Sequence, residues 1–250
     1  VLFMHNRETD DGDILHFAEI FPEVSLVLTE TSWAQMVHVY DLMRQRKNIL
    51  IETSRLHTWD ALEMTVEEFG AERVVFGLGE KAHNGASIAA LARAKISEKD
   101  RELIAHGNLA RLLDWPIDAS DKVHESTIQN PFWYRLMHNE TIGEPLLDAH
   151  VHLGPGGGYI LREHSMAGQI AQALQGMKEL GVETMIVSNM QALVSDPVKG
   201  NLEMEAAFVP HGGKLKGYFA FNPHYEKELL AILDDCFARD IFVGFKFLCS

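Results

Sequence analysis

The chain of 250 residues contains little cysteine and few basic residues, and it has no long apolar run. Cys236 and Cys249 are too few for a disulfide framework, and they lack the second pair that a zinc knuckle needs. We expect both thiols to be reduced and buried. Lysine and arginine number 22 against 36 aspartates and glutamates, so the formal net charge is −14. An acidic chain without a basic face is not expected to bind nucleic acid or an anionic membrane.

No apolar stretch approaches the ~18 residues that a membrane span needs, and the first residues turn acidic too soon for a signal peptide. We therefore expect a globular, cytoplasmic protein. Assembly into a homo-oligomer stays open. The sequence has no initiator methionine and begins and ends inside apolar runs, which predicts a fragment of a longer polypeptide.

Short apolar runs rich in β-branched and aromatic residues alternate with amphipathic stretches, a pattern typical of βαβ units and a parallel sheet. The predicted strands are residues 1–4, 24–28, 48–53, 73–77, 145–152, 183–188, 215–221 and 241–248. The predicted helices are residues 33–46, 60–69, 87–94, 98–113, 165–180 and 226–239. Asp60 is the expected N-cap of one helix, and Gly70 and Gly181 are expected to end two. The repeat averages about 31 residues, close to one-eighth of a (βα)8 barrel.

Residues 114–145 interrupt this rhythm with three prolines and the aromatic cluster Phe132, Trp133 and Tyr134. The sequence therefore predicts a domain over residues 1–117, a connector over 118–145 and a second domain over 146–250.

The strongest chemical signal is the pair His150 and His152 near the end of a predicted strand. Strand alternation places residues two apart on the same face, so both imidazoles are expected to converge. Two nitrogen donors on one rigid strand suit a divalent metal at the mouth of a barrel, and the following glycines leave room for a substrate. The alternative is a pair of half-buried histidines that bind nothing.

The run PLLDAHVHLG, residues 145–154, resembles the first strand of the amidohydrolase superfamily, in particular the branch that includes aminocarboxymuconate-semialdehyde decarboxylase. GYFAFNPHY resembles the third strand of that branch, and VGFKFL, which contains Lys246, resembles the fourth. The resemblance implies zinc held by His150, His152 and further ligands. It also implies metal-dependent hydrolysis or non-oxidative decarboxylation of a small-molecule substrate.

Residues 1–117 resemble the other end of the same family and include its closing phrase, here Gly107 to Leu112. The resemblance implies that His5, at the end of the family's fifth strand, is a metal ligand. Glu30 stands where the sixth strand usually carries histidine, and Gly79 stands where the eighth carries the catalytic aspartate. Glu80 is a weak substitute, because adjacent strand residues face opposite ways. The catalytic residue is therefore unknown.

Because the late half of the family comes first, we predict an α/β fold of the (βα)8 TIM-barrel type in permuted order, with strands 5–8 followed by strands 1–4. Two separate half-barrels are the alternative. Closure would bring His5 to His150 and His152. We expect this fragment to be poorly active, and the alternative function is a catalytically dead scaffold or regulatory domain.

Other candidates carry weaker signals. Glu30 and Lys246 are candidates for a metal ligand or for a group that supports one, and His224, His83 and Asn84 are candidates for substrate binding. A dinucleotide-binding loop at Gly77–Ala82 is a remote alternative, because its fingerprint needs a helix to begin at once and an acidic residue ~20 positions later. The remaining histidines on predicted helices or in the connector are expected to be surface residues or satisfied by neighbours.

Overall fold

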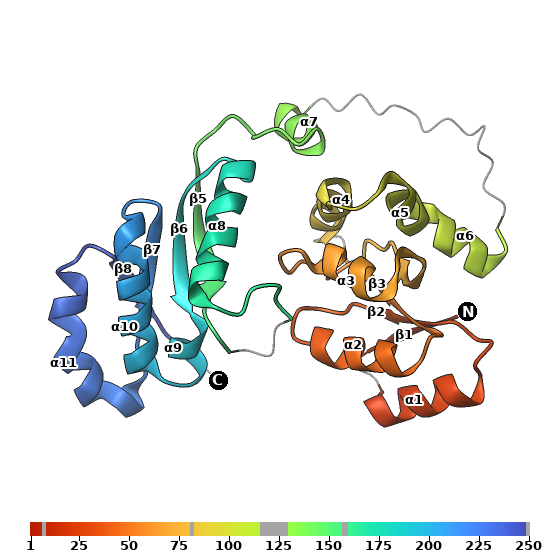
Figure 1. Ribbon diagram of the computed structural model, residues 1–250, viewed down its shortest axis with the longest axis horizontal. Helices are drawn as coiled ribbons and strands as arrows, with labels where there is room; N and C mark the ends of the chain where they lie inside the picture. The colour runs from red at the N-terminus through yellow and green to blue at the C-terminus, as the bar shows by residue number, and fades with distance from the viewer. Residues whose placement is uncertain (7–8, 81–82, 116–129, 157–159, 249–250) are drawn as a thin grey trace. The chain divides into compact units, whose positions relative to one another are not determined.

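The computed structural model describes the whole chain except residues 7–8, 81–82, 116–129, 157–159 and 249–250. The chain folds as two compact units (Figure 1). One consists of Val1–Ile128 with Gly158–Arg162, and the other of Gln129–Gly157 with Glu163–Ser250. Cys249 and much of the predicted connector lie outside the described residues. The described part of the connector includes one helix, α7 (Pro131–Met137), which Asn130 caps.

The first unit is built on a four-stranded parallel sheet with the strand order β1-β2-β3-β4. The strands are β1 (Leu2–His5), β2 (Leu26–Thr29), β3 (Ile49–Glu52) and β4 (Val74–Val75). The helices of this unit are α1 (Asp11–Ile20), α2 (Met36–Gln45), α3 (Ala61–Phe69), α4 (Asn84–Arg93), α5 (Glu98–Glu102) and α6 (Asn108–Leu113). A π-helical turn, Leu103–Gly107, joins the last two.

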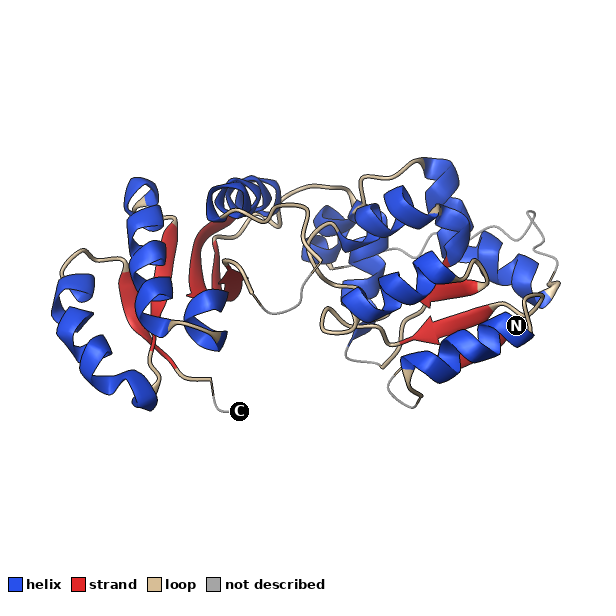
Figure 2. Ribbon diagram, turned by 60° about the horizontal axis from the view of Figure 1, so that its bottom comes forward, coloured by secondary structure: helices blue, strands red, loops and turns tan. Residues whose placement is uncertain are grey.

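The second unit repeats the design with the strand order β5-β6-β7-β8, again parallel throughout. Its strands are β5 (Leu146–Leu153), β6 (Val182–Asn189), β7 (Leu215–Ala220) and β8 (Phe242–Lys246). Its main helices are α8 (Met166–Leu180), α9 (Met190–Val194), α10 (Pro197–Phe208) and α11 (Glu226–Phe237). Helices α8, α10 and α11 pack against β6, β7 and β8 in turn. Figure 2 shows the helices of this unit in blue beside its strands in red.

All eight predicted strands are confirmed, so the chain is an α/β protein with two four-stranded parallel sheets. A closed barrel is not shown. Helices α1 and α10 were not predicted, because neither has a strong apolar stripe and Gly200 interrupts the second. No helix within the described ranges is long and apolar enough to cross a membrane.

The structure confirms the two helix ends predicted at Gly70 and Gly181 and corrects the capping role predicted for Asp60. Gly70 and Gly181 end α3 and α8 with φ angles of 85° and 76°, which glycine adopts without strain. Asp60 does precede α3, but its φ is 53° and its side chain makes no capping hydrogen bond. Its carboxylate instead lies 3.3 Å from the guanidinium of Arg162, which also binds Glu67 with both terminal nitrogens.

The two faces of the first sheet are both covered by apolar side chains. Leu28 and Ile51 face the main core, where α1 to α4 pack. The alternate residues Val27, Leu50 and Val75 face the other way and pack against Leu109 and Leu112 of α6. Helix α6 therefore covers part of the face that would line the inside of a barrel.

The second sheet is covered on its helical face. Val187 and Phe219 are fully buried in the core beneath the helices, and Cys236 of α11 joins them as a free thiol. The expected burial of Cys236 is confirmed, and it raises the pKa of the thiol to about 11, so the thiol stays protonated at neutral pH. On the edge strands, Leu147 is 71% exposed and Val243 is 49% exposed.

Candidate metal centre

The imidazoles of His150 and His152 converge near the C-terminal end of β5. Their Nε2 atoms lie 3.0 Å apart, and the rings are tilted by 64° with centroids 4.9 Å apart. The predicted convergence of the two side chains is confirmed. The C-terminal ends of parallel strands are also where enzymes with (βα)8 barrels place their active sites.

A bulge in β5 contributes to this arrangement. Two residues lie between Asp148 and Val151, whereas only one lies between their partners Met185 and Val187 on β6. One extra residue in a strand re-aims the side chains around it. The Asp148 carboxylate accepts a hydrogen bond of 3.0 Å from the backbone N–H of His150, which holds this irregular segment in place.

The pair has the spacing of a metal chelate. For an ion at the usual zinc–nitrogen distance of ~2.0–2.1 Å from both Nε2 atoms, the nitrogen–metal–nitrogen angle would be roughly 95°. Within the described part of the chain, however, no group of three or more histidine, cysteine, aspartate or glutamate side chains is arranged to hold a metal. The residues present thus fit two ligands of a metal site and do not complete it.

Burial lowers the pKa of His152 from its ordinary value of 6.5, and the nearby His150 and Lys246 lower it further. A neutral imidazole is the form that binds a metal. Lys246 lies at the end of β8, and two strands separate β8 from β5 in the order of the sheet. The predicted metal-supporting role of Lys246 stays a prediction.

His224, predicted to contact substrate, lies in the short 3₁₀ helix after β7. Its backbone N–H donates to the side chain of Asn222, and its own side chain is exposed. The structure thus places it past a strand end, and its proposed contact with substrate stays a prediction.

The first unit has a different cluster at its strand ends, centred on the buried Glu52. This carboxylate, 7% exposed, accepts hydrogen bonds from the backbone and hydroxyl of Ser54 at 2.5 and 2.7 Å and from the backbone of Glu30 at 3.2 Å. A Cβ atom at Gly77 would overlap it. Glycine at this position therefore makes room for a side chain of the same unit, which weakens the reading of Gly77–Ala82 as a nucleotide loop.

The side chains of His5 and Glu30 meet at the strand ends, but a cation is already beside them. Glu30 Oε2 lies 3.3 Å from His5 Nε2 and 3.5 Å from Arg55 Nε. A divalent ion bound to this carboxylate would be repelled by the adjacent guanidinium. This cluster as it stands does not fit a metal ion, and the role of His5 as a ligand remains a prediction.

Glu80 reaches the same cluster, with its carboxylate 3.7 Å from Arg55 Nη2. The strand alternation expected to turn it away does not apply, because β4 ends at Val75 and the chain turns at Gly79, whose φ is 59°. Lys81 and Ala82 lie outside the described residues.

His83 and Asn84 lie at the start of α4. The ring of His83 is 5.7 Å from that of His57, whose Nε2 is 3.4 Å from the hydroxyl of Ser87. Burial lowers the pKa of His57, and His83 and Arg55 lower it further. Sequence reasoning gave His57 no role and missed Glu52 and Arg55, because no spacing marks single polar residues in a strand end or a loop.

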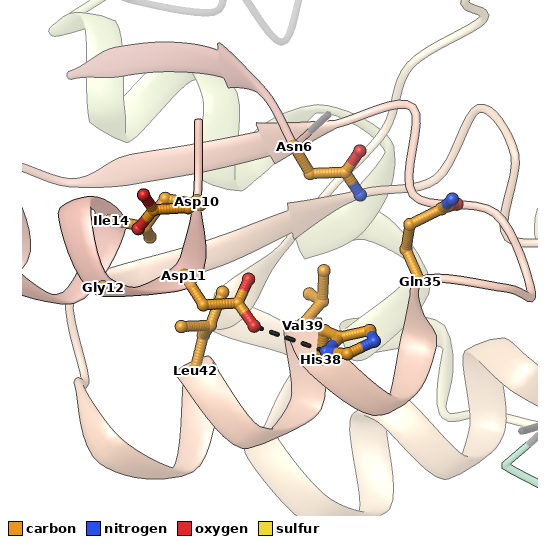
Figure 3. A pocket seen from close by; sticks show the side chains of 9 residues that line it. All are labelled: Asn6, Asp10, Asp11, Gly12, Ile14, Gln35, His38, Val39 and Leu42. Carbon is orange, nitrogen blue, oxygen red and sulfur yellow. Dashed lines mark ion pairs between the residues drawn. The ribbon is translucent and has the colours of Figure 1, made fainter. Parts of the chain in front are cut away.

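A separate pocket of about 490 Å³ lies between the first turns of α1 and α2 (Figure 3). Its polar side chains bind other groups of the same unit. Asp11 forms an ion pair of 3.3 Å with His38, Asp10 caps α1, and the amide of Asn6 donates to Thr31. None of the predicted metal or substrate residues lines it, so it does not compete with the histidine pair as a candidate centre.

Comparison with known protein families, with curated proteins and with solved structures finds no match to this chain.

Proposed function

We propose that the intact protein is a metal-dependent hydrolase or non-oxidative decarboxylase of the amidohydrolase-related type. The observation that carries this proposal is the 3.0 Å separation of the His150 and His152 Nε2 atoms at the end of a parallel strand. Zinc would be held by these two nitrogens. Its other ligands would be groups that the described residues do not bring to the pair. The bound ion would polarise a carbonyl or carboxylate oxygen and make a coordinated water more acidic.

The residues of this chain have separate tasks in the proposal. His150 and His152 hold the ion, and the bulge at Asp148 fixes their aim. The ammonium group of Lys246 supplies positive charge near the pair, which favours a substrate with a carboxylate. The resembling family transfers protons with an aspartate, and this chain has Gly79 at that position. We therefore expect it to convert its substrate slowly.

Turnover and its dependence on metal test this function. Zinc-loaded protein should hydrolyse simple esters or amides, or decarboxylate a β-keto acid, at a low rate that a chelator abolishes and added zinc restores. Equal activity in the chelated protein would refute metal dependence, and rapid turnover would refute the expected weak activity.

A second candidate function applies to the first unit alone. Arg55 forms ion pairs with the carboxylates of Glu30 and Glu80, so a cation of the unit itself already lies beside Glu30, where a metal would bind. This arrangement favours a catalytically dead scaffold or regulatory domain for Val1–Ile128. Such a domain needs no metal.

We also propose that the two sheets are half-barrels in permuted order, so that closure would pair β8 with β1. Exposed apolar residues on these edge strands, including Phe3 at 45% and Phe245 at 47%, favour closure. The covering of the first sheet by α6 opposes it.

Closure predicts a disulfide between cysteines at positions 3 and 245, because paired strands bring Cα atoms within ~4.4–6.8 Å. Both variants would also carry Cys249→Ser, so that this native thiol cannot form a disulfide with the introduced cysteines. Cys236 needs no replacement because it is buried. A Phe3→Cys, Leu147→Cys pair is the control, as β5 is not a neighbour of β1 in that barrel. Absence of the first cross-link, or equal yield of both, would refute closure.

A further inference from the structure

Ser188 lies on β6, and its hydroxyl group is buried. The residue is 1% exposed, and its Oγ has no hydrogen-bond partner among the described residues. A buried polar group left unpaired costs free energy, so such groups are rare and call for an explanation. Nothing in the sequence singled this serine out.

The register of the second sheet places Ser188 beside the candidate metal centre. Val151 is paired with Val187, and both pack into the core beneath the helices. The next pair is His152 with Ser188. Because side chains alternate along a strand, both residues face away from the core, on strands ~4.8 Å apart.

The following pair confirms this alternation. Leu153 returns to the core, and the side chain of its partner Asn189 donates a 3.0 Å hydrogen bond to the carbonyl of Gly200 on α10. The helical face therefore contains the residues before and after Ser188. Its hydroxyl belongs to the opposite face with His152.

The chemistry of that face defines what the hydroxyl would bind. Two imidazole nitrogens suit a metal ion, Lys246 adds a positive charge, and Ser188 adds one O–H donor. A donor beside two centres of positive charge is complementary to an oxygen anion. We propose that Ser188 Oγ donates a hydrogen bond to a carboxylate oxygen of a ligand bound at the His150–His152 centre. The inference rests on the proposed function and names the substrate class as a small carboxylate.

The first test needs no metal. Because the hydroxyl has no hydrogen-bond partner in the part of the chain that the structure describes, Ser188→Ala should leave the thermal midpoint of the metal-free protein unchanged or raise it. The matched control is Ser54→Ala, since Ser54 is also fully buried but donates to the Glu52 carboxylate. This control should lower the midpoint by several degrees. A comparable loss in Ser188→Ala would show a structural role and overturn the proposal.

The second test measures ligand binding with Co²⁺ as the metal and acetate as the oxygen-donor probe. Acetate titrations followed by the visible spectrum of bound Co²⁺ should give about tenfold weaker acetate binding in Ser188→Ala, with Co²⁺ affinity unchanged. Equal acetate affinity in both proteins would overturn the role of Ser188 and leave the proposed function standing. Failure of the unmodified protein to bind Co²⁺ would overturn both.

Discussion

Replacing both histidines of the pair, His150→Gln with His152→Gln, is expected to weaken zinc binding by at least about 100-fold. Loss of groups that merely support a metal ligand costs ~10–100-fold, and this variant removes two ligands outright. Glutamine keeps a polar side chain of similar length, and neither histidine belongs to the buried core, so the fold should survive. A competition titration against a chromophoric chelator measures the affinity.

The matched control for that variant is His211→Gln with His224→Gln. These histidines also belong to the second unit, in 3₁₀ helices at the two ends of β7, and neither takes part in the pair. Zinc affinity should not change in the control. Equal losses in both variants, or no loss in the first, would contradict the assignment.

Replacing Gly200 with alanine is expected to destabilise the second unit by about 2 kcal/mol. Gly200 lies within α10, beside the short helix α9 (Figure 1), and a Cβ atom there would lie 2.6 Å from both Cα and Cβ of Ala192. The obstacle is mostly backbone, which cannot move aside as a flexible side chain can. The clash should outweigh the ~1 kcal/mol that alanine gains over glycine in a helix.

Thermal denaturation followed by circular dichroism should show a fall of roughly 5–10 °C for Gly200→Ala. Gly168→Ala in α8 is the control, because the added methyl meets mainly the flexible end of Glu163. That variant should be as stable as the unmodified protein or more so. A Gly200→Ala protein of unchanged stability would mean that α9 and α10 do not pack this closely.

The sequence predicts the strands of this protein well because their signal is local. Buried parallel strands are short apolar runs, and all eight are found where expected. Helices were less predictable where contacts with a neighbouring helix determine the residues and the sequence shows no regular apolar repeat. Helix α10 carries Gly200 at its contact with α9, which reads in the sequence as a break.

The site was predictable only where spacing has a direct geometric meaning. His150 and His152 converge because residues two apart share a face. Glu80 joins the cluster around Arg55 through a turn at Gly79, which no strand pattern encodes. Ser188 depends on the register between β5 and β6, a long-range property that a single sequence does not reveal.

X-ray absorption spectroscopy of the zinc-loaded protein identifies the atoms bound to the metal and so tests whether His150 and His152 bind zinc. We expect one zinc per chain with imidazole nitrogens at ~2.0–2.1 Å, oxygen donors for the rest and no sulfur. The nitrogen signal should disappear in the variant that lacks His150 and His152. Sulfur at ~2.3 Å, or a nitrogen shell that persists in that variant, would contradict a metal centre on this histidine pair.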